Sequence, residues 1–219
     1  MNYSKKIAKA FQAAHTILRT GPRTWSIARA ACKEGATQHW SELSQLLHVL
    51  HDLRPARIME IGMDRGGTMA LWSQIADADA CLIGLDIKIG AGVEARIRSK
   101  LKVSQTLFLI ESDSHAAAAK QRVLEALGSN KLDFLFIDGD HSYEGVKQDL
   151  ENYGSLVRRG GLIALHDIVP DHHVRFGIQT GHNAGGVHQF WREISCSFPH
   201  YEFIERVAQD GYGIGVLRL

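Results

Sequence analysis

The sequence lacks a surplus of charge of one sign. Lysine and arginine together number 25 and aspartate and glutamate 24, so 219 residues carry a formal net charge of only +1. A protein that follows a nucleic acid backbone needs a basic excess to neutralise the phosphates. We therefore expect no nucleic acid partner.

Cysteines and long apolar runs are also scarce. The three cysteines, Cys32, Cys81 and Cys196, form neither a CxxC pair nor a disulfide framework, so we expect reduced structural thiols. No stretch approaches the ~20 apolar residues of a membrane span, and no apolar signal-peptide core follows the basic N-terminus. We expect a cytoplasmic protein with no membrane partner.

What is abundant is apolar sequence in short pieces, 45% of the residues, enough for one sizeable core. We expect residues 1–54 to form an N-terminal helical segment and residues 55–219 the main domain. In the first segment Trp40, Leu43, Leu47 and Leu50 recur at helical spacing, before Pro55 ends the pattern.

From residue 57 onward, apolar runs alternate with amphipathic helical segments: RIMEIG, ACLIGLD, TLFLIES, LDFLFID and GLIALHD. Runs that are apolar almost throughout are typical of parallel strands covered by helices on both faces. Two further β-rich runs, YEFIERV and YGIGVLRL, flank the turn AQDG. The pattern predicts a doubly wound α/β sheet, mostly parallel, that ends in an antiparallel hairpin.

The helix after the fourth strand has the clearest amphipathic pattern. We expect it to reach residue 158 and to stop at Gly160 and Gly161. Its apolar face carries Val146, Leu150, Tyr153 and Val157, and its polar residues are Lys147, Asp149, Glu151 and Arg158.

The first strand leads into a glycine loop, EIGMDRGGT, where missing side chains would let a ligand approach the backbone. The spacing of Gly62, Gly66 and Gly67 is not GxGxxG, which argues against a nicotinamide oxidoreductase. Asp86 ends the second strand and suits a ribose diol, or else caps a helix. Ser112 and Asp113 end the third strand and suit an adenine edge, or else a cap.

A stronger constellation follows the next two strands. The fourth delivers Asp138-Gly139-Asp140-His141 and the fifth delivers His166-Asp167. If these strands are neighbours, the carboxylates repel unless a proton or cation is present, and carboxylates with imidazole are ligands for Mg²⁺ or Mn²⁺. The alternative is that Asp140 and Asp167 cap helices while His166 is a hydrogen-bonded core histidine.

The segments MEIGMDRGGT, FIDGDHSYEGVKQDL, GGLIALHDI and GVHQFW resemble class I S-adenosylmethionine-dependent methyltransferases. More narrowly, they resemble the small metal-dependent group that includes sugar and antibiotic O-methyltransferases and cephalosporin hydroxylase-like proteins. The resemblance spans roughly residues 38–219. It implies the strand order 3-2-1-4-5-7-6 and transfer of a methyl group from S-adenosylmethionine to a hydroxyl of a small molecule, assisted by a divalent cation.

The resemblance also implies roles for individual residues. Asp86 would take the ribose, Ile87 would pack on the adenine, and Ser112 with Asp113 would approach its edge. The methionine part of the cofactor would lie against the first-strand loop, with Asp138 bordering the same site; the loop residues are Glu60, Gly62, Met63, Asp64, Gly66, Gly67 and Thr68.

Asp138, His166 and Asp167 fall on the metal-ligand positions of this group. Relatives usually carry Asp-Asp, Glu-Asp or Asp-Asn at the second position, so His166 is a departure that would ligate directly, select a softer metal or leave the site empty. The base of catechol-type relatives falls on His141, with Asp140 as its rival.

The acceptor is expected to lie under residues 1–54 and the histidine-rich loop 169–186. Apolar positions on the N-terminal helical segment would offer a surface for a homo-oligomer. The alternative function is a non-methylating accessory or cofactor-binding protein of the cephalosporin hydroxylase-like type.

Overall fold

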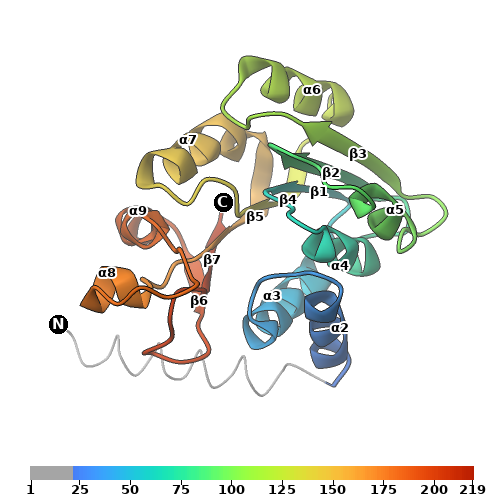
Figure 1. The fold of residues 1–219 in the computed structure, drawn as a ribbon. Helices are drawn as coiled ribbons and strands as arrows, with labels where there is room; N and C mark the ends of the chain where they lie inside the picture. Colours follow the sequence, from blue (N-terminus) through green and yellow to red (C-terminus); the bar gives the residue numbers. More distant parts are fainter. Residues whose placement is uncertain (1–21) are drawn as a thin grey trace.

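The computed structural model describes residues 22–219, and a seven-stranded sheet runs through it in the order β3-β2-β1-β4-β5-β7-β6 (Figure 1). The predicted fold class and strand order are confirmed. The part of the expected N-terminal helical segment that precedes residue 22 lies outside the described residues. The strands are β1 (Arg57–Ile61), β2 (Cys81–Asp86), β3 (Thr106–Glu111), β4 (Leu132–Ile137), β5 (Val157–His166), β6 (His200–Phe203) and β7 (Ile214–Arg218).

The first five strands pair in parallel, and β7 pairs antiparallel with both β5 and β6. The predicted C-terminal hairpin is therefore present, with shorter strands than the apolar runs suggested. Because the five parallel strands point the same way, their carboxyl ends meet at one edge of the sheet.

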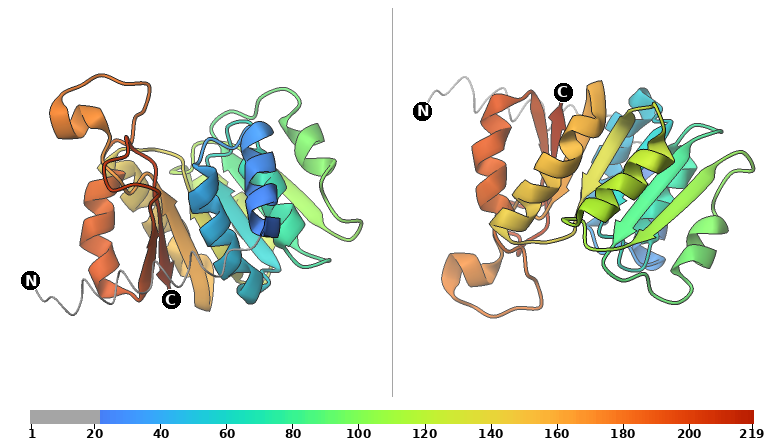
Figure 2. Two further views of the ribbon diagram at one scale, coloured as in Figure 1. Left: turned by 90° about the horizontal axis from the view of Figure 1, so that it is seen from below. Right: turned by 90° about the horizontal axis from the view of Figure 1, so that it is seen from above.

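Helices cover both faces of the sheet (Figure 2). One face carries α2 (Pro22–Lys33), α3 (Trp40–Leu53), α4 (Gly67–Ile75) and α5 (Val93–Arg98). The other carries α6 (Ala117–Leu127), α7 (Tyr143–Tyr153) and α9 (Val187–Ile194), while the short α8 (His172–Phe176) lies in the loop after β5.

The two-sided cover explains why the central strands are apolar almost throughout. Phe134 and Phe136 of β4 belong to the cluster under α3 and α4, whereas Leu135 and Ile137 belong to the cluster under the opposite helices. Alternate side chains of a strand point to opposite faces, so both sets must be apolar when both faces are buried.

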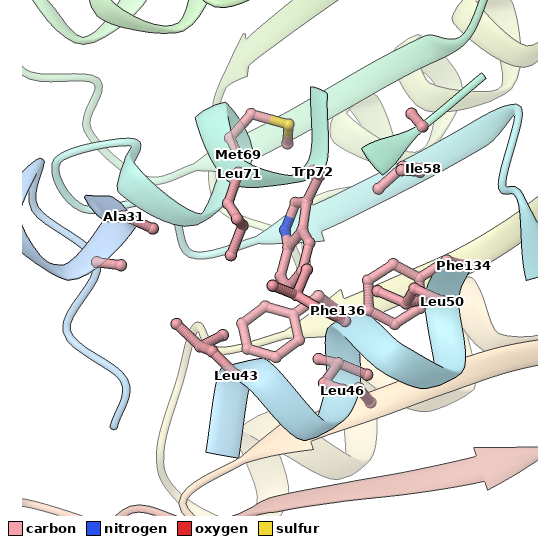
Figure 3. Packing of buried hydrophobic residues seen from close by; sticks show 14 of the residues in the cluster. Ala31, Leu43, Leu46, Leu50, Ile58, Met69, Leu71, Trp72, Phe134 and Phe136 are labelled. Carbon is pink, nitrogen blue, oxygen red and sulfur yellow. The ribbon is translucent and has the colours of Figure 1, made fainter. Parts of the chain in front are cut away.

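Trp72 of α4 lies at the centre of the first cluster (Figure 3). Its ring meets Phe134 and Phe136 edge to face, with both centroid distances at 5.4 Å. Leu43 and Leu50 of α3 are fully buried in the same cluster. The predicted helix is present as α3, and the described part of the N-terminal segment shares the core of the sheet.

The predicted end of the helix after β4 was wrong. α7 ends at Tyr153, a 3₁₀ turn (Gly154–Leu156) follows, and Val157 already opens β5. Gly161 lies within the strand, at a register shift between β4 and β5, where a Cβ would come within 2.6 Å of Val157 Cγ1. The glycines therefore permit an irregular strand and do not stop a helix.

The helical pattern places Asp149 among the polar residues of α7 and away from its apolar face, but the structure buries its side chain completely.

Between residues 22 and 219, no helix has both the length and the apolar character needed to cross a bilayer.

Candidate functional site

A cavity of about 1150 Å³ opens at the carboxyl edge of the parallel strands. Thirteen of the residues singled out from the sequence line it: Gly62, Met63, Asp64, Thr68, Asp86, Ile87, Ser112, Asp113, Asp138, Asp140, His141, His166 and Asp167. Glu60, Gly66 and Gly67 are not among its lining residues.

Backbone hydrogen bonds at the strand ends align these residues along the same edge of the sheet. The Gly62 amide donates to Leu85 O, the Asp138 amide to Ile61 O, and the Ser112 amide to Asp86 O, at 2.8–2.9 Å. The ladders thus continue one residue beyond β1, β4 and β3, and place the first polar residue of each loop at the cavity.

Two glycines of the first loop make room for protein atoms. At Gly62 (φ +80°) a Cβ would lie 2.0 Å from Asp138 O, and at Gly67 it would lie 2.1 Å from the Ala36 amide nitrogen. The packing of the protein itself therefore requires both glycines, and Gly62 also lines the cavity. Gly62 lets β1 approach β4, and Gly67 lets α4 approach the chain ahead of α3.

Glu60 lies behind the cavity wall, fully buried on β1. Thr68 donates a hydrogen bond to Glu60 Oε1. Burial raises the pKa of Glu60 well above its ordinary value, and the hydrogen bond from Thr68 only partly offsets this. A protonated Glu60 would support the first turn of α4 from below.

Asp86 binds the glycine loop with its own carboxylate. Its Oδ2 accepts from the backbone amides of Met63 (2.7 Å) and Asp64 (3.1 Å), and its Oδ1 accepts from the backbone amide of Lys88 (2.9 Å). Asp113 likewise accepts from the His115 amide at 2.8 Å, in the turn ahead of α6. Both carboxylates shape their loops while lining the cavity.

The groups after β4 and β5 form one cluster, as the predicted adjacency of these strands required. His166 Nδ1 lies 3.0 Å from Asp138 Oδ1 and 3.6 Å from Asp167 Oδ2. His141 Nε2 lies 3.5 Å from Asp138 Oδ1, and His141 Nδ1 lies 3.3 Å from Asp167 Oδ2. Ligand atoms of Asp138, His141 and Asp167 all lie within 4.8 Å of one another.

Charges balance within this cluster. The hydrogen bond to Asp138, together with both carboxylates, raises the pKa of His141 to about 9 against the effect of burial. Burial lowers the pKa of His166, but Asp138 and Asp167 outweigh it and raise the value to about 9. The imidazoles in turn lower the pKa of Asp138 despite its burial. The positive charges of the two imidazolium rings balance the carboxylates of Asp138 and Asp167, as a divalent cation would. Carboxylate oxygens and imidazole nitrogens are suitable ligands for such an ion.

The capping alternative is wrong for both aspartates. Ser142 is the N-cap of α7 and accepts from the Gly145 amide, while Asp140 Oδ1 accepts from the Ser142 amide ahead of the helix. Asp167 Oδ1 accepts a hydrogen bond at 2.9 Å from the backbone amide of Tyr212, which lies in the loop before β7. His166 Nδ1 faces Asp138, but His166 Nε2 is buried without a hydrogen-bond partner among the described residues.

Sequence reasoning missed several cavity residues from distant parts of the chain. Gln38 donates to Asp138 Oδ2, and Asn183 O accepts from His141 Nδ1 at 2.6 Å. Tyr212 lines the cavity with its ring 4.5 Å from that of His182. No local pattern in the sequence indicates these contacts, because each depends on packing between segments that lie far apart in the chain.

Backbone strain concentrates at the cavity. Four non-glycine residues in the described part of the chain have positive φ, and three of them, Asp64, Asp167 and Tyr212, line the cavity. The left-handed conformation is costly for a tyrosine, so such residues persist only where their surroundings hold them. The hydrogen bond between Tyr212 and Asp167 joins two of them.

Comparison with known proteins gives a family match. Residues 59–168 match a family model described as a methyltransferase domain. A viral relative, the uncharacterized protein R132 of Acanthamoeba polyphaga mimivirus, is 33% identical over 115 residues. That match covers 50% of each protein, so the aligned region spans about half the length of the curated relative.

Several solved structures share the fold. The O-methyltransferase TomG from Streptomyces achromogenes, in complex with S-adenosylmethionine, aligns over all of both chains with a TM-score of 0.61 at 15% identity. MycE, in complex with Mg and S-adenosylhomocysteine, also gives 0.61 at 17% identity, covering 90% of this chain and 54% of its own. An O-methyltransferase from Bacillus cereus gives 0.57 at 15% identity, covering 95% and 96%.

Proposed function

Because the chain belongs to the methyltransferase domain family, we propose that it transfers the methyl group of S-adenosylmethionine to a hydroxyl oxygen of a small molecule. One observation carries the proposal: a single cavity joins the glycine loop after β1 to the acid and imidazole cluster after β4 and β5. A sulfonium methyl group is already activated, so the protein has to align two reactants, exclude water and remove one proton.

The cofactor would lie along the strand ends, with its methionine part at Gly62–Asp64 and its ribose at Asp86. Ile87 is 76% exposed within the cavity wall and offers an apolar surface to the base. The third-strand residues Ser112 and Asp113 would border the far side of the adenine. Glu60, Gly66, Gly67 and Thr68 would support this site by holding the loop, since three of the four do not line the cavity.

Asp138, His166 and Asp167 would hold a divalent cation, Mg²⁺ or Mn²⁺. When bound, the cation would lower the pKa of an acceptor hydroxyl and help to orient it. Its positive charge would also replace the imidazolium protons that now balance the two carboxylates.

His141 would accept the hydroxyl proton at Nε2, since its Nδ1–H is fixed on Asn183 O. In the protein without a cation, the pKa of about 9 keeps His141 protonated at neutral pH and unfit as a base. Once Asp138 and Asp167 are neutralised, that pKa falls toward the ordinary range of histidine. Asp140 is the weaker base, because the hydrogen bond from the Ser142 amide lowers its pKa.

The acceptor would enter between the chain ahead of α3 and the loop 169–186. Gln38 comes from the first of these, and His182 and Asn183 from the second; all three line the cavity. These polar residues would therefore line the part of the cavity next to the acid and imidazole cluster that the cofactor would not fill.

The test has two parts. Calorimetry should show binding of S-adenosylhomocysteine, and Mn²⁺ binding should be lost in Asp138→Asn/Asp167→Asn. Isotope-labelled S-adenosylmethionine should then yield methylated products from a panel of hydroxylated sugars, natural products and catechols, and chelation should abolish the yield. Binding without transfer to any acceptor would favour the accessory-protein alternative, and no binding at all would overturn the proposal.

A further inference from the structure

The two edges of the sheet differ in how open they are to a further strand. One edge is β6, which is only four residues long, follows Pro199 and carries the polar Glu202. The other edge is β3 (Figure 1), which is six residues long. Its sequence TLFLIE contains neither lysine nor proline, the residues that commonly keep an edge strand from pairing. The β3 edge is therefore the open one.

Backbone groups on the outer side of β3 have no hydrogen-bond partner among residues 22–219. The amides of Thr106 and Ser112 donate to carbonyl oxygens at the two ends of β2, at 3.0 and 2.9 Å, so both point inward. Because the direction of these groups alternates along a strand, the amides and carbonyls of Leu107 and Leu109 point outward. They can bind a second strand without disturbing the pairing with β2.

A cavity of about 420 Å³ follows this open edge. Residues 107–110 of β3 line it, together with Glu94 and Arg98 of α5 on one face of the sheet and Arg122, Glu125 and Ala126 of α6 on the other. Phe108 is the exposed apolar side chain of the strand, at 43%. It lies on the α6 side, since Ile110, two residues further on, belongs to the cluster under that helix. The edge thus combines backbone groups, an exposed ring and space between two helices.

The charges around the edge are self-complementary. α5 presents Glu94 and Arg98, which lie 2.7 Å apart, and α6 presents Glu125 and Arg122. Arg122 has no ion-pair partner among residues 22–219. A two-fold axis perpendicular to the sheet would set each helix beside its own copy, so that the acid of one faces the base of the other. A peptide of either net charge would be attracted by one member of each pair and repelled by the other. The fitting occupant is a second copy of this chain.

We propose that β3 pairs with β3 of a second copy, antiparallel and about a two-fold axis at Phe108, so that the two seven-stranded sheets become continuous. Leu107 of one copy would exchange backbone hydrogen bonds with Leu109 of the other. The two Phe108 side chains would face each other at the axis, in a pair without backbone hydrogen bonds, where facing side chains lie closest.

The strands alone are too small for a stable interface, which buries about 800 Å² on each partner. α5 and α6 supply the remaining contact on the two faces of the sheet, through the charged residues that line the cavity. This surface differs from the N-terminal helical segment on which the sequence predicted a homo-oligomer. The pairing goes beyond the proposed function and does not depend on it.

Sedimentation equilibrium of the full chain, at up to about 100 µM, should give the mass of two chains. Arg122→Glu should weaken the dimer by about 10-fold, because each of two symmetric contacts would then join two acids. Glu125→Arg should do the same, and the double variant should return to within about 3-fold of the wild-type affinity. Arg192→Glu is the matched control, since it makes the same change of charge on α9, which packs against β5.

Crosslinking tests the register of the strands. Phe108→Cys, combined with Cys196→Ser to remove the exposed native thiol, should form a disulfide between copies on mild oxidation. The facing Cβ atoms of such a pair lie about 4.5–5.5 Å apart. Val103→Cys in the same background is the control. Val103 is fully exposed ahead of β3, so random collision would crosslink it more readily than residue 108, whereas the proposed register keeps the two copies of it far apart.

Hydrogen exchange tests the pairing in the wild-type protein. The amides of Leu107 and Leu109 should be protected at high protein concentration and exchange faster on dilution, whereas the Thr106 amide, bonded toward β2, should be protected at both. Protection that does not change with concentration would mean that the same chain covers the edge, and would overturn the inference.

Three other results would also overturn it. They are a monomer at every concentration, a dimer that Arg122→Glu does not weaken, and crosslinking at residue 103 in preference to residue 108. None of these measurements uses the cofactor or an acceptor, so a failure here leaves the proposed function standing, and a failure to bind S-adenosylhomocysteine leaves this inference standing.

Discussion

Gln38 donates a hydrogen bond to Asp138 Oδ2, although 100 residues separate the two in the chain. The bond engages one carboxylate oxygen from the N-terminal side and leaves Oδ1 to face His141 and His166. The chain ahead of α3 therefore orients a residue of the acid and imidazole cluster.

Replacing Gln38 should weaken cation binding. Gln38→Met keeps the volume and removes the donor, and loss of an outer hydrogen bond to a metal ligand typically lowers metal affinity by about 10- to 100-fold. Titration of Mn²⁺ followed by electron paramagnetic resonance measures the affinity. Gln45→Met is the matched control, because among the described residues Gln45 donates to Ser41 O within its own helix and not to the cluster. Equal affinities in the two variants would contradict the role given to Gln38.

Cation affinity should rise with pH up to about 9. His141 and His166 each have a pKa raised to about 9 without a cation, so both are protonated at neutral pH and must lose protons as the ion binds. Calorimetry at pH 7.5 in buffers of different ionisation enthalpy should show proton release. An affinity independent of pH between 6.5 and 9 would show that these imidazoles do not compete with the ion.

The stability of the cation-free protein should fall over the same pH range. A group whose pKa is higher in the folded protein stabilises it fully below the unfolded value, about 6.5 for histidine, and loses that contribution as pH passes the folded value of about 9. Thermal unfolding in the presence of a chelator should show a falling midpoint from pH 6.5 to 9. His141→Gln should flatten the slope, and a slope that is the same in both proteins would exclude His141 as its source.

Gly62→Ala should disrupt the cavity. The added Cβ would lie 2.0 Å from Asp138 O, so the strand end must move, at a cost of about 3 kcal/mol or more. Gly92→Ala isolates the effect of backbone conformation. Gly92 has φ +82°, close to the +80° of Gly62, but no atom of residues 22–219 lies within 4 Å of an added Cβ, and the expected cost is about 1–2 kcal/mol. Denaturant unfolding and S-adenosylhomocysteine affinity should both separate the two variants.

Glu60→Gln should preserve stability. If burial keeps Glu60 protonated, the amide replaces a neutral group of the same shape, and we expect a stability change below about 1 kcal/mol, or roughly 2–4 °C in midpoint. Glu60→Leu would leave the Thr68 hydroxyl without its acceptor and cost about 1–3 kcal/mol. A large loss in Glu60→Gln would mean that the charged carboxylate is required.

The sheet and most of the cavity residues could be predicted because their signals are local. A buried strand followed by an acid, as at Ile137-Asp138 and His166-Asp167, indicates both the strand and its end at the sheet edge within a few consecutive residues. The order of the strands came from the family resemblance, because an apolar run does not indicate which other strands it will pair with.

The failures share a different cause. Asp149 looks polar and exposed by helical spacing, but that side of α7 faces the loop after β3 instead of solvent. Gly67 looks like part of a ligand loop, but it accommodates the backbone of Ala36. In both cases the deciding neighbour lies more than 30 residues away, and no pattern along one segment contains it.

The carboxylate of Glu42 has a consequence for synthesis of the chain. It is fully buried on α3, and it accepts from the amides of Glu205 and Gly213 and from the Gln209 side chain, all more than 160 residues downstream. Before the ribosome has added residues 205–213, the parallel strands that α3 packs against are already synthesised, but its acid has none of these three donors. The helix that supports the cavity can therefore reach its final place only after residues 205–213 have been synthesised, and a chain cut before residue 205 would leave this buried acid without these donors.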